Sequence, residues 1–244
     1  MSYQEYLPHP ALRNYIDAYW TVNLDNTDIS GTQRILPDCC TDIIFNRGNI
    51  IYDSHQQKTM LANESYLVGT MTTYRDTPGK AGTSMLGIRF RPGGMGVFYT
   101  LNQYEITDLA VPFQDKTLGD LIWSGKNLLH HINQYFLKKL PVQPVILTGI
   151  INEIYIAKGQ VRIPELTSKF NISERKLERL FKQDVGVTVK GLARLVRFTN
   201  TLAQIRNPSR LQSLTQLAYH AGYYDQAHLC NEVKAYTGLT PAQL

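Results

Sequence analysis

The sequence predicts a two-domain protein, with an α+β domain that is rich in β-structure and barrel-like in outline, followed by an all-α domain. Three observations support this fold class. Short β-branched or aromatic runs separated by turn residues fill the first 90 residues. Helical periodicity dominates after residue 145. Between them, K-K-L-P-V-Q-P at residues 138–144 carries two prolines that suit an extended linker. We therefore expect domains at residues 1–140 and 146–244, joined by residues 141–145.

The elements of the N-terminal domain follow from its local patterns. It should open with a short helix at residues 10–19, on which Leu12, Tyr15, Ile16 and Tyr19 are the apolar positions. A helix at residues 118–136 should end it, and the apolar stretch 95–101 should form a short helix after the turn Pro92-Gly93-Gly94. The expected strands lie at residues 19–24, 41–45, 50–53, 66–70 and 84–90.

Two arginines alternate with apolar residues in I-R-F-R, so Ile88 and Phe90 should face one side of a strand and Arg89 and Arg91 the other. If both arginines converged on a pocket, they would suit an anionic effector. The favoured alternative is that they are exposed strand residues, or that they pair with Asp38 and Asp42 and hold the fold together.

The last 35 residues contain a distinctive pair of helices. A short amphipathic helix with Leu214, Leu217 and Ala218 stops at Gly222, where glycine can adopt the left-handed conformation that ends helices. Asp225 is placed to cap a second helix, which Gly238 closes, and Thr240-Pro241 opens another short turn of helix.

The same arrangement occurs about 50 residues earlier. Ile163, Leu166 and Phe170 give a short helix, and Ser173 caps the next, which Gly186 terminates. Between the two copies, residues 189–205 read as one long amphipathic helix. Helix, tight turn and second helix is the helix-turn-helix layout, in which the second helix enters the DNA major groove. The two motifs should span residues 162–184 and 213–236.

These residues resemble the AraC-type (AraC/XylS) transcriptional regulators, whose DNA-binding unit has two such motifs joined by a linker helix. The resemblance covers residues 144–244. Positions that match the family pattern are Ser173, Leu177, Arg179, Phe181, Lys182, Gly186, Arg194, Arg197, Ala218, Gly222, Tyr223, Asp225, His228, Leu229, Val233, Lys234, Gly238, Thr240 and Pro241.

Several positions depart from the family pattern. The family usually has a basic residue at the position of Asn231, phenylalanine at Val233 and proline at Val189. The family's terminal segment Thr-Pro-x-x-Tyr-Arg is incomplete in this sequence, which ends at Leu244. The chain is therefore expected to be naturally short or truncated. In the N-terminal domain, residues 36–46 and 87–95 resemble the L-P-D-G-C-x-D-I-I-F-N and G-x-R-F-x-P-G-G segments of one AraC-type subgroup, with Cys39 in place of a frequent glycine.

The distribution of charge assigns DNA binding to the second domain. From residue 146 onward there are 13 Lys and Arg against 7 Asp and Glu, a net charge of +6, whereas the preceding residues have 12 against 13. Phosphate binding requires such a basic surface. From residue 211 onward, however, Lys234 is the only basic residue, against two acidic ones. The first motif should therefore dominate the affinity.

The candidate DNA-contacting residues lie on the two recognition helices. On the first, the arginines can pair with guanine and Glu178 with the cytosine amino group, although some basic residues will contact only phosphate. On the second, Gln226 or Asn231 could read adenine. The alternative is a solvated helix face without a DNA contact. The candidates are Arg175, Glu178, Arg179, Lys182, Tyr224, Gln226, His228, Asn231 and Lys234.

Other classes of protein are disfavoured. No run approaches 18 apolar residues, and the N-terminus lacks the features of a signal peptide, so we expect a soluble cytoplasmic protein without a membrane partner. Cys39, Cys40 and Cys230 give no disulfide framework. The chain has no nucleophile elbow, P-loop or dinucleotide fingerprint, and its histidines are scattered, so no enzymatic activity, metal or cofactor is expected.

The sequence thus predicts a sequence-specific DNA-binding transcription regulator, for example an activator, with an N-terminal sensor or self-association domain. Double-stranded DNA is the expected partner, and the family resemblance adds RNA polymerase, a small-molecule effector and homodimer formation. The alternative is a protein-interaction module with a degenerate second motif, in which only the first motif binds DNA, and weakly.

Overall fold

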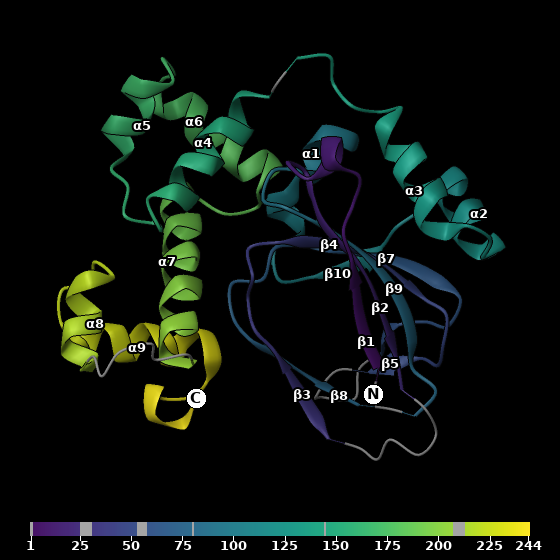
Figure 1. Ribbon diagram of the computed structural model, residues 1–244, viewed down its shortest axis with the longest axis horizontal. Helices are drawn as coiled ribbons and strands as arrows, with labels where there is room; N and C mark the ends of the chain where they lie inside the picture. Colours follow the sequence, from purple (N-terminus) through teal and green to yellow (C-terminus); the bar gives the residue numbers. More distant parts are fainter. Residues whose placement is uncertain (1, 25–30, 53–57, 80, 144, 207–212) are drawn as a thin grey trace.

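A computed structural model describes residues 2–24, 31–52, 58–79, 81–143, 145–206 and 213–244. It contains a β-rich N-terminal part and an all-helical C-terminal part (Figure 1), which confirms the predicted fold class. The main sheet has six strands, and every pair of neighbours is antiparallel. In spatial order its strands are β1 (Ser2–Tyr6), β2 (Ile16–Asn23), β9 (Ser84–Phe90), β4 (Thr41–Asn46), β7 (Glu64–Val68) and β10 (Ala110–Pro112).

Two small antiparallel ribbons accompany the main sheet. One pairs β3 (Thr32–Ile35) with β8 (Arg75–Pro78), and the other pairs β5 (Ile51–Tyr52) with β6 (Lys58–Met60). Because side chains alternate across a strand, the main sheet has two distinct faces. One face carries the fully buried core of the domain and packs against α1 (Met95–Phe98), α2 (Lys116–Ser124) and α3 (Leu128–Leu137). The residues of that face include Tyr19, Ile43, Phe45, Leu86, Ile88 and Phe90.

Three predictions for this domain were wrong in detail. The helix expected at residues 10–19 is only a 3-10 turn, η1 (Pro10–Leu12), and β2 already begins at Ile16. β2 pairs with β1 on one side and β9 on the other, and this pairing overrides the local helical pattern. The stretch 95–101 is helical only over α1. The single helix expected at 118–136 is divided into α2 and α3 by left-handed conformations at Gly125 and Asn127.

The helical domain matches its predicted elements closely. The predicted linker helix at 189–205 is confirmed as α7, and Figure 1 shows it standing between the two motifs. The helices are α4 (Ile146–Ile156), α5 (Ile163–Lys169), α6 (Glu174–Asp184), α7 (Val189–Arg206), α8 (Leu214–His220) and α9 (Gln226–Thr237), followed by the 3-10 turn η3 (Pro241–Gln243). α3 ends at Leu137 and α4 starts at Ile146, on either side of the expected linker.

The predicted caps explain why the recognition helices begin where they do. The Ser173 side chain accepts a hydrogen bond from the Lys176 backbone amide at 3.3 Å, and Asp225 accepts one from the His228 amide at 2.7 Å. Gly222 and Gly238 have φ of 77° and 71°, the left-handed conformation expected at these helix ends. Within the described residues, no helix is both long and apolar enough to cross a membrane.

The two domains pack against each other through the segments at residues 36–46 and 87–95. Cys39 is 1% exposed and belongs to the hydrophobic core of the helical domain. A side chain at Gly93 would meet Leu147 and Ile151 of α4. Cys39 itself has φ of 69°, a conformation that glycine adopts without steric cost. The cysteine side chain thus fills helical-domain core at a position suited to glycine.

Candidate nucleic-acid interface

The first recognition helix, α6, presents its basic residues to solvent. Leu177 and Phe181 are fully buried on its inner side. Arg175, Arg179 and Lys182 are exposed on the outer side, and Glu178 beside them is half-buried. Since an exposed guanidinium can pair with guanine O6 and N7, this face has the chemistry for reading bases.

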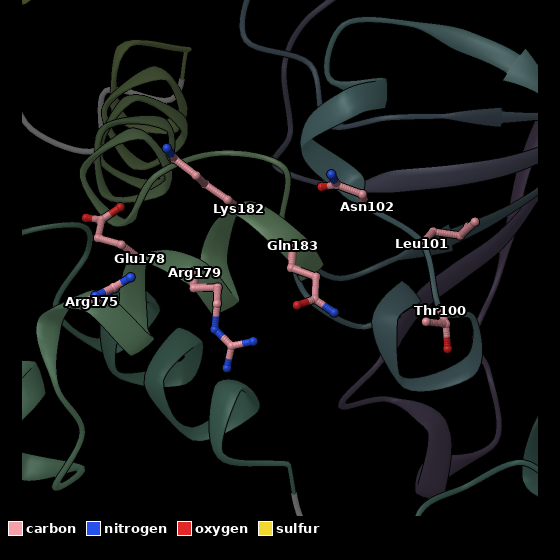
Figure 2. A pocket seen from close by; sticks show the side chains of 8 residues that line it. All are labelled: Thr100, Leu101, Asn102, Arg175, Glu178, Arg179, Lys182 and Gln183. Carbon is pink, nitrogen blue, oxygen red and sulfur yellow. The ribbon is translucent and has the colours of Figure 1, made fainter.

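A groove of about 670 Å³ separates this face from the N-terminal domain. Its walls are α6 on one side and residues 100–102 on the other, and Figure 2 shows Asn102, Leu101 and Thr100 across from Gln183. Next to it lies η2 (Gln103–Ile106), whose Tyr104 ring centroid is 5.5 Å from Lys182 Nζ. The sequence patterns gave no indication of this wall, because residues 100–106 carry no motif.

The turn that follows α6 is held to the N-terminal domain by two hydrogen bonds. Thr70 Oγ1 donates to the Val185 carbonyl at 2.8 Å, and Thr107 Oγ1 donates to the Gly186 carbonyl at 2.7 Å. Gly186 has φ of 86°, and a Cβ atom there would lie 2.9 Å from the Gln103 carbonyl oxygen. This close approach requires glycine, which explains the residue at this position beyond its role in ending α6.

The second recognition helix, α9, is also open to solvent but has less positive charge. Gln226, His228, Asn231 and Lys234 are exposed, as is Tyr224 just before the helix. The Gln226 side-chain oxygen accepts a hydrogen bond from Thr215 Oγ1 at 2.8 Å, which orients the amide. The helix therefore offers amide and imidazole groups to a ligand, with a single lysine for phosphate.

A buried carboxylate joins α9 to the linker helix. Glu232 is 3% exposed, and its carboxylate lies 3.0 Å from both Arg194 and Arg197 of α7. Arg197 also stacks over the Tyr223 ring at 4.4 Å. The family pattern included both arginines, but the sequence gave no reason to pair them with Glu232. The two arginines therefore offset the negative charge of Glu232, which is one of the two acidic residues in the second motif.

The two candidate effector-binding arginines are separated by the structure. Arg91 is 48% exposed and pairs with Asp17 at 3.4 Å. Arg89 instead lines a cavity of about 450 Å³ in the N-terminal domain, where Asp38 and Asp42 lie within 4 Å of its guanidinium. The favoured interpretation, pairing with Asp38 and Asp42, is confirmed for Arg89, whereas Arg91 has a different partner. The thiols of Cys39, Cys40 and Cys230 form no disulfide.

Comparison with known families agrees with this architecture. Residues 166–244 match a family model described as a helix-turn-helix domain, and residues 4–112 match a domain of unknown function, DUF6597. No curated protein matches the chain.

Several solved structures are similar to this chain. One is ToxT from Vibrio cholerae, with a TM-score of 0.48 and 9% identity over 100% of this chain and 97% of that chain. The C-terminal domain of AraT from Geobacillus stearothermophilus has a TM-score of 0.37 and 19% identity, over 42% of this chain and 85% of that one. The xylose-binding transcription activator XylR has a TM-score of 0.37 and 16% identity, over 51% and 38%.

A C-terminal domain with two helix-turn-helix motifs on one linker helix, attached to a β-rich domain with a cavity, defines a two-domain DNA-binding transcription regulator. The chain carries an AraC-type helix-turn-helix domain at residues 166–244 and a DUF6597 domain at residues 4–112. This class consists of transcription factors rather than enzymes.

Proposed function

We propose that this regulator recognises a specific DNA site by placing α6 and α9 in successive major-groove segments on one face of the duplex. The observation that carries this proposal is the position of the two recognition helices at opposite ends of α7. Its 18 residues span about 27 Å at 1.5 Å per residue. Such a spacer suits two helices that enter grooves about 34 Å apart.

The residues divide into two proposed roles. Arg175, Glu178, Arg179 and Lys182 on α6 supply most of the affinity and the strongest base contacts, because they combine exposure with positive charge. On α9, Gln226, His228 and Asn231 contact base edges, while Tyr224 and Lys234 contact the backbone. The proposed domains are residues 1–140 and 146–244, with residues 141–145 as the linker.

The docked arrangement of the domains restricts access to α6. A recognition helix has to sink into a major groove about 12 Å wide and 8.5 Å deep, and the helix with its side chains fills that width. In the protein, residues 100–102 form the opposite wall of the 670 Å³ groove that borders the exposed basic face of α6. Tyr104 lies beside Lys182. We infer that DNA and the N-terminal domain compete for this face.

The N-terminal domain would then control this competition. The cavity beside Arg89 is the proposed effector site, and its wall residue Leu36 also packs against the core of the helical domain. A bound effector can therefore change the balance between docked and released helical domains. Formation of a homodimer through this domain and contact with RNA polymerase, as an activator, complete the proposed role.

A second candidate function is that α9 binds a protein partner while α6 alone binds DNA. The observation in its favour is the low positive charge of the second motif, in which Lys234 is the only basic residue after position 210.

The deciding experiment selects bound duplexes from a random DNA pool and footprints the preferred sequence at moderate salt. Protection of two successive major-groove segments, lost on Arg179→Ala, supports the proposal. Protection of one segment supports the protein-partner alternative for α9. If no sequence is enriched even after Thr70→Val and Thr107→Val loosen the domain contact, sequence-specific binding by this chain is wrong.

A further inference from the structure

The cavity of the N-terminal domain lies on the face of the main sheet opposite the core. Residues of the central strands form its floor, among them Trp20 on β2, Asp42 on β4 and Arg89 on β9. Gln33 and Ile35 of β3 and Thr77 of β8 line the same cavity. At about 450 Å³, the cavity falls within the size range of sites for small organic molecules.

Gly87 fixes the position of the Trp20 side chain. The two residues lie opposite each other in the β2–β9 register. A Cβ atom at Gly87 would lie 2.0 Å from Trp20 Cε2, so the indole occupies the space that any side chain there would need. Trp20 Nε1 also donates to Asp42 Oδ1 at 2.6 Å. The indole is therefore held against the sheet as a fixed aromatic surface in the cavity.

The cavity has an apolar part and a polar part. The apolar part includes Ile51 and Met60, which form a small hydrophobic cluster with Ile44, Val68 and Met85. Tyr3, Trp20, Asp38, Asp42 and Arg89 form the polar part. A ligand that fits both parts has an apolar body and a single polar head.

Carboxylates outnumber cations in the polar part. The Arg89 guanidinium lies 3.0 Å from Glu5, 3.4 Å from Asp38 and 3.7 Å from Asp42. One positive charge therefore faces three carboxyl groups. Burial, together with the nearby Asp38, raises the pKa of Asp42 to about 7, although Arg89 and the Trp20 hydrogen bond oppose this rise. The polar part has more negative charge than Arg89 can compensate.

The two remaining arginines of the cavity wall are committed to other partners. Arg34 forms a two-bonded pair with Asp76, both contacts at 2.7 Å, and donates to the Thr237 carbonyl. Arg75 donates to the Asp108 carbonyl at 2.5 Å. Neither contacts the polar part of the cavity in the described structure, so an anionic head has no uncommitted cation there.

We propose that the cavity binds an organic cation with an apolar body, whose ammonium head lies among Trp20, Asp38 and Asp42. This inference rests on the proposed effector role of the domain and names the chemical class of that effector. The aromatic face of Trp20 attracts a cation, and the two carboxylates supply the opposite charge. The apolar body lies against Met60 and Met85, since methionine adapts to varied ligand shapes.

The test uses three probes that share an eight-carbon chain and differ in the head: n-octylammonium, octanoate and 1-octanol. Trp123→Phe leaves Trp20 as the single tryptophan, so that fluorescence reports on the cavity directly. Binding is measured without DNA at about pH 8, where Asp42 is largely ionised. We expect octylammonium to bind at least about tenfold more tightly than octanoate or octanol.

Two variants test whether the carboxylates of Asp38 and Asp42 cause the preference for octylammonium. In the Trp123→Phe background, Asp42→Asn or Asp38→Asn should abolish most of the preference for octylammonium while leaving octanol binding unchanged. Asp120→Asn, an exposed aspartate on α2, is the matched control and should keep the preference. Using both cavity variants keeps the test valid if one of them fails to fold.

The outcomes separate this inference from the proposed function. Equal or tighter binding of octanoate, or no binding of any probe, overturns the cationic ligand class. The effector role is tested separately, by DNA affinity with and without a bound probe. If octylammonium binds as expected but DNA affinity does not change, the ligand class stands and the effector role is wrong.

Discussion

Arg197 Nη2 on α7 contacts both carboxylate oxygens of Glu232 on α9, at 3.1 Å and 3.0 Å. Glu232 is buried and Arg197 is mostly buried, so water competes weakly for this pair. The pair fixes how the second recognition helix is presented by the linker helix. The position of α9 relative to α6 therefore depends on a polar contact as well as on the apolar core.

Arg197→Ala should destabilise the protein because it leaves a buried carboxylate with only Arg194 and a partly exposed His228 nearby. Removing one partner of a buried ion pair costs about 3 kcal/mol. We expect a lower Tm and weaker footprint protection by the second motif. Arg206→Ala, at the exposed end of the same helix, should change neither. Equal Tm values for the two variants would contradict the structural role of the pair.

Arg179→Ala should weaken binding to the selected duplex by about tenfold or more, because one good base contact contributes about 1–3 kcal/mol. Fluorescence anisotropy with labelled duplex measures the loss. Lys126→Ala removes the same charge from an exposed loop of the N-terminal domain and is the control. If both variants lose affinity equally, Arg179 acts only through the overall charge of the protein.

Asn231→Arg should strengthen DNA binding if α9 enters the major groove. A new phosphate contact should also steepen the dependence of log K on log salt by about 0.9. Gln114→Arg adds the same charge to an exposed site of the N-terminal domain. An unchanged salt slope for Asn231→Arg would favour the alternative in which α9 binds a protein partner.

The double variant Thr70→Val and Thr107→Val removes the two hydroxyls that hold the turn after α6. Each hydrogen bond contributes about 1 kcal/mol, so the domain contact weakens. If that contact competes with DNA, affinity for the selected duplex should rise by about tenfold. Thr117→Val on α2 is the exposed control. Unchanged or weaker DNA binding would argue against competition.

Asp42 should make stability depend on pH. Its pKa is raised from 3.8 to about 7, so the folded state holds the proton more tightly than the unfolded chain. The free energy of unfolding should therefore fall as pH rises from about 4 to about 7. The charged groups around it are Arg89, Asp38, Asp17 and, through Arg89, Glu5, and the nearby Cys40 thiol stays neutral because burial raises its pKa.

Asp42→Asn mimics the protonated carboxyl and should flatten this dependence. Urea unfolding of both proteins at about pH 5 and about pH 8 gives the comparison, since groups other than Asp42 titrate in both. Between about pH 5 and about pH 8, the free energy of unfolding should therefore fall less for the variant than for the parent protein. A parallel pH dependence in the two proteins would show that Asp42 does not keep its proton in the fold.

The helical domain was predictable because its signals are local. Ser173 and Asp225 cap helices, and Gly222 and Gly238 end them, and each of these effects involves only a few neighbouring residues. The apolar periodicity of residues 189–205 likewise depends on one helix alone. These signals located both motifs and the linker helix almost to the residue.

The sheet was harder to predict because its edge strands have little apolar signal. β1 is S-Y-Q-E-Y and is largely exposed, so no alternation marks it. β3, β6, β8 and β10 are three or four residues long and were also missed. Their positions depend on pairing with strands distant in sequence, which local patterns do not report.

The contact between the domains could not be predicted from either domain alone. Nothing in the sequence indicates that Cys39 joins the core of the helical domain. The hydroxyls of Thr70 and Thr107 are ordinary in sequence, and only the fold brings them to Val185 and Gly186. The same applies to the wall that residues 100–102 form across from α6.

If the N-terminal domain competes with DNA for α6, as proposed, their contact also determines how the occupancy of DNA sites depends on the amount of protein. A tethered domain acts as an internal competitor at a fixed effective concentration, whatever the number of copies in the cell. The apparent Kd for DNA equals the intrinsic Kd divided by the fraction of released molecules. Raising expression would fill more sites but would not alter that fraction. Under the proposed competition, the strength of this one intramolecular contact therefore determines the fraction of molecules that can bind DNA.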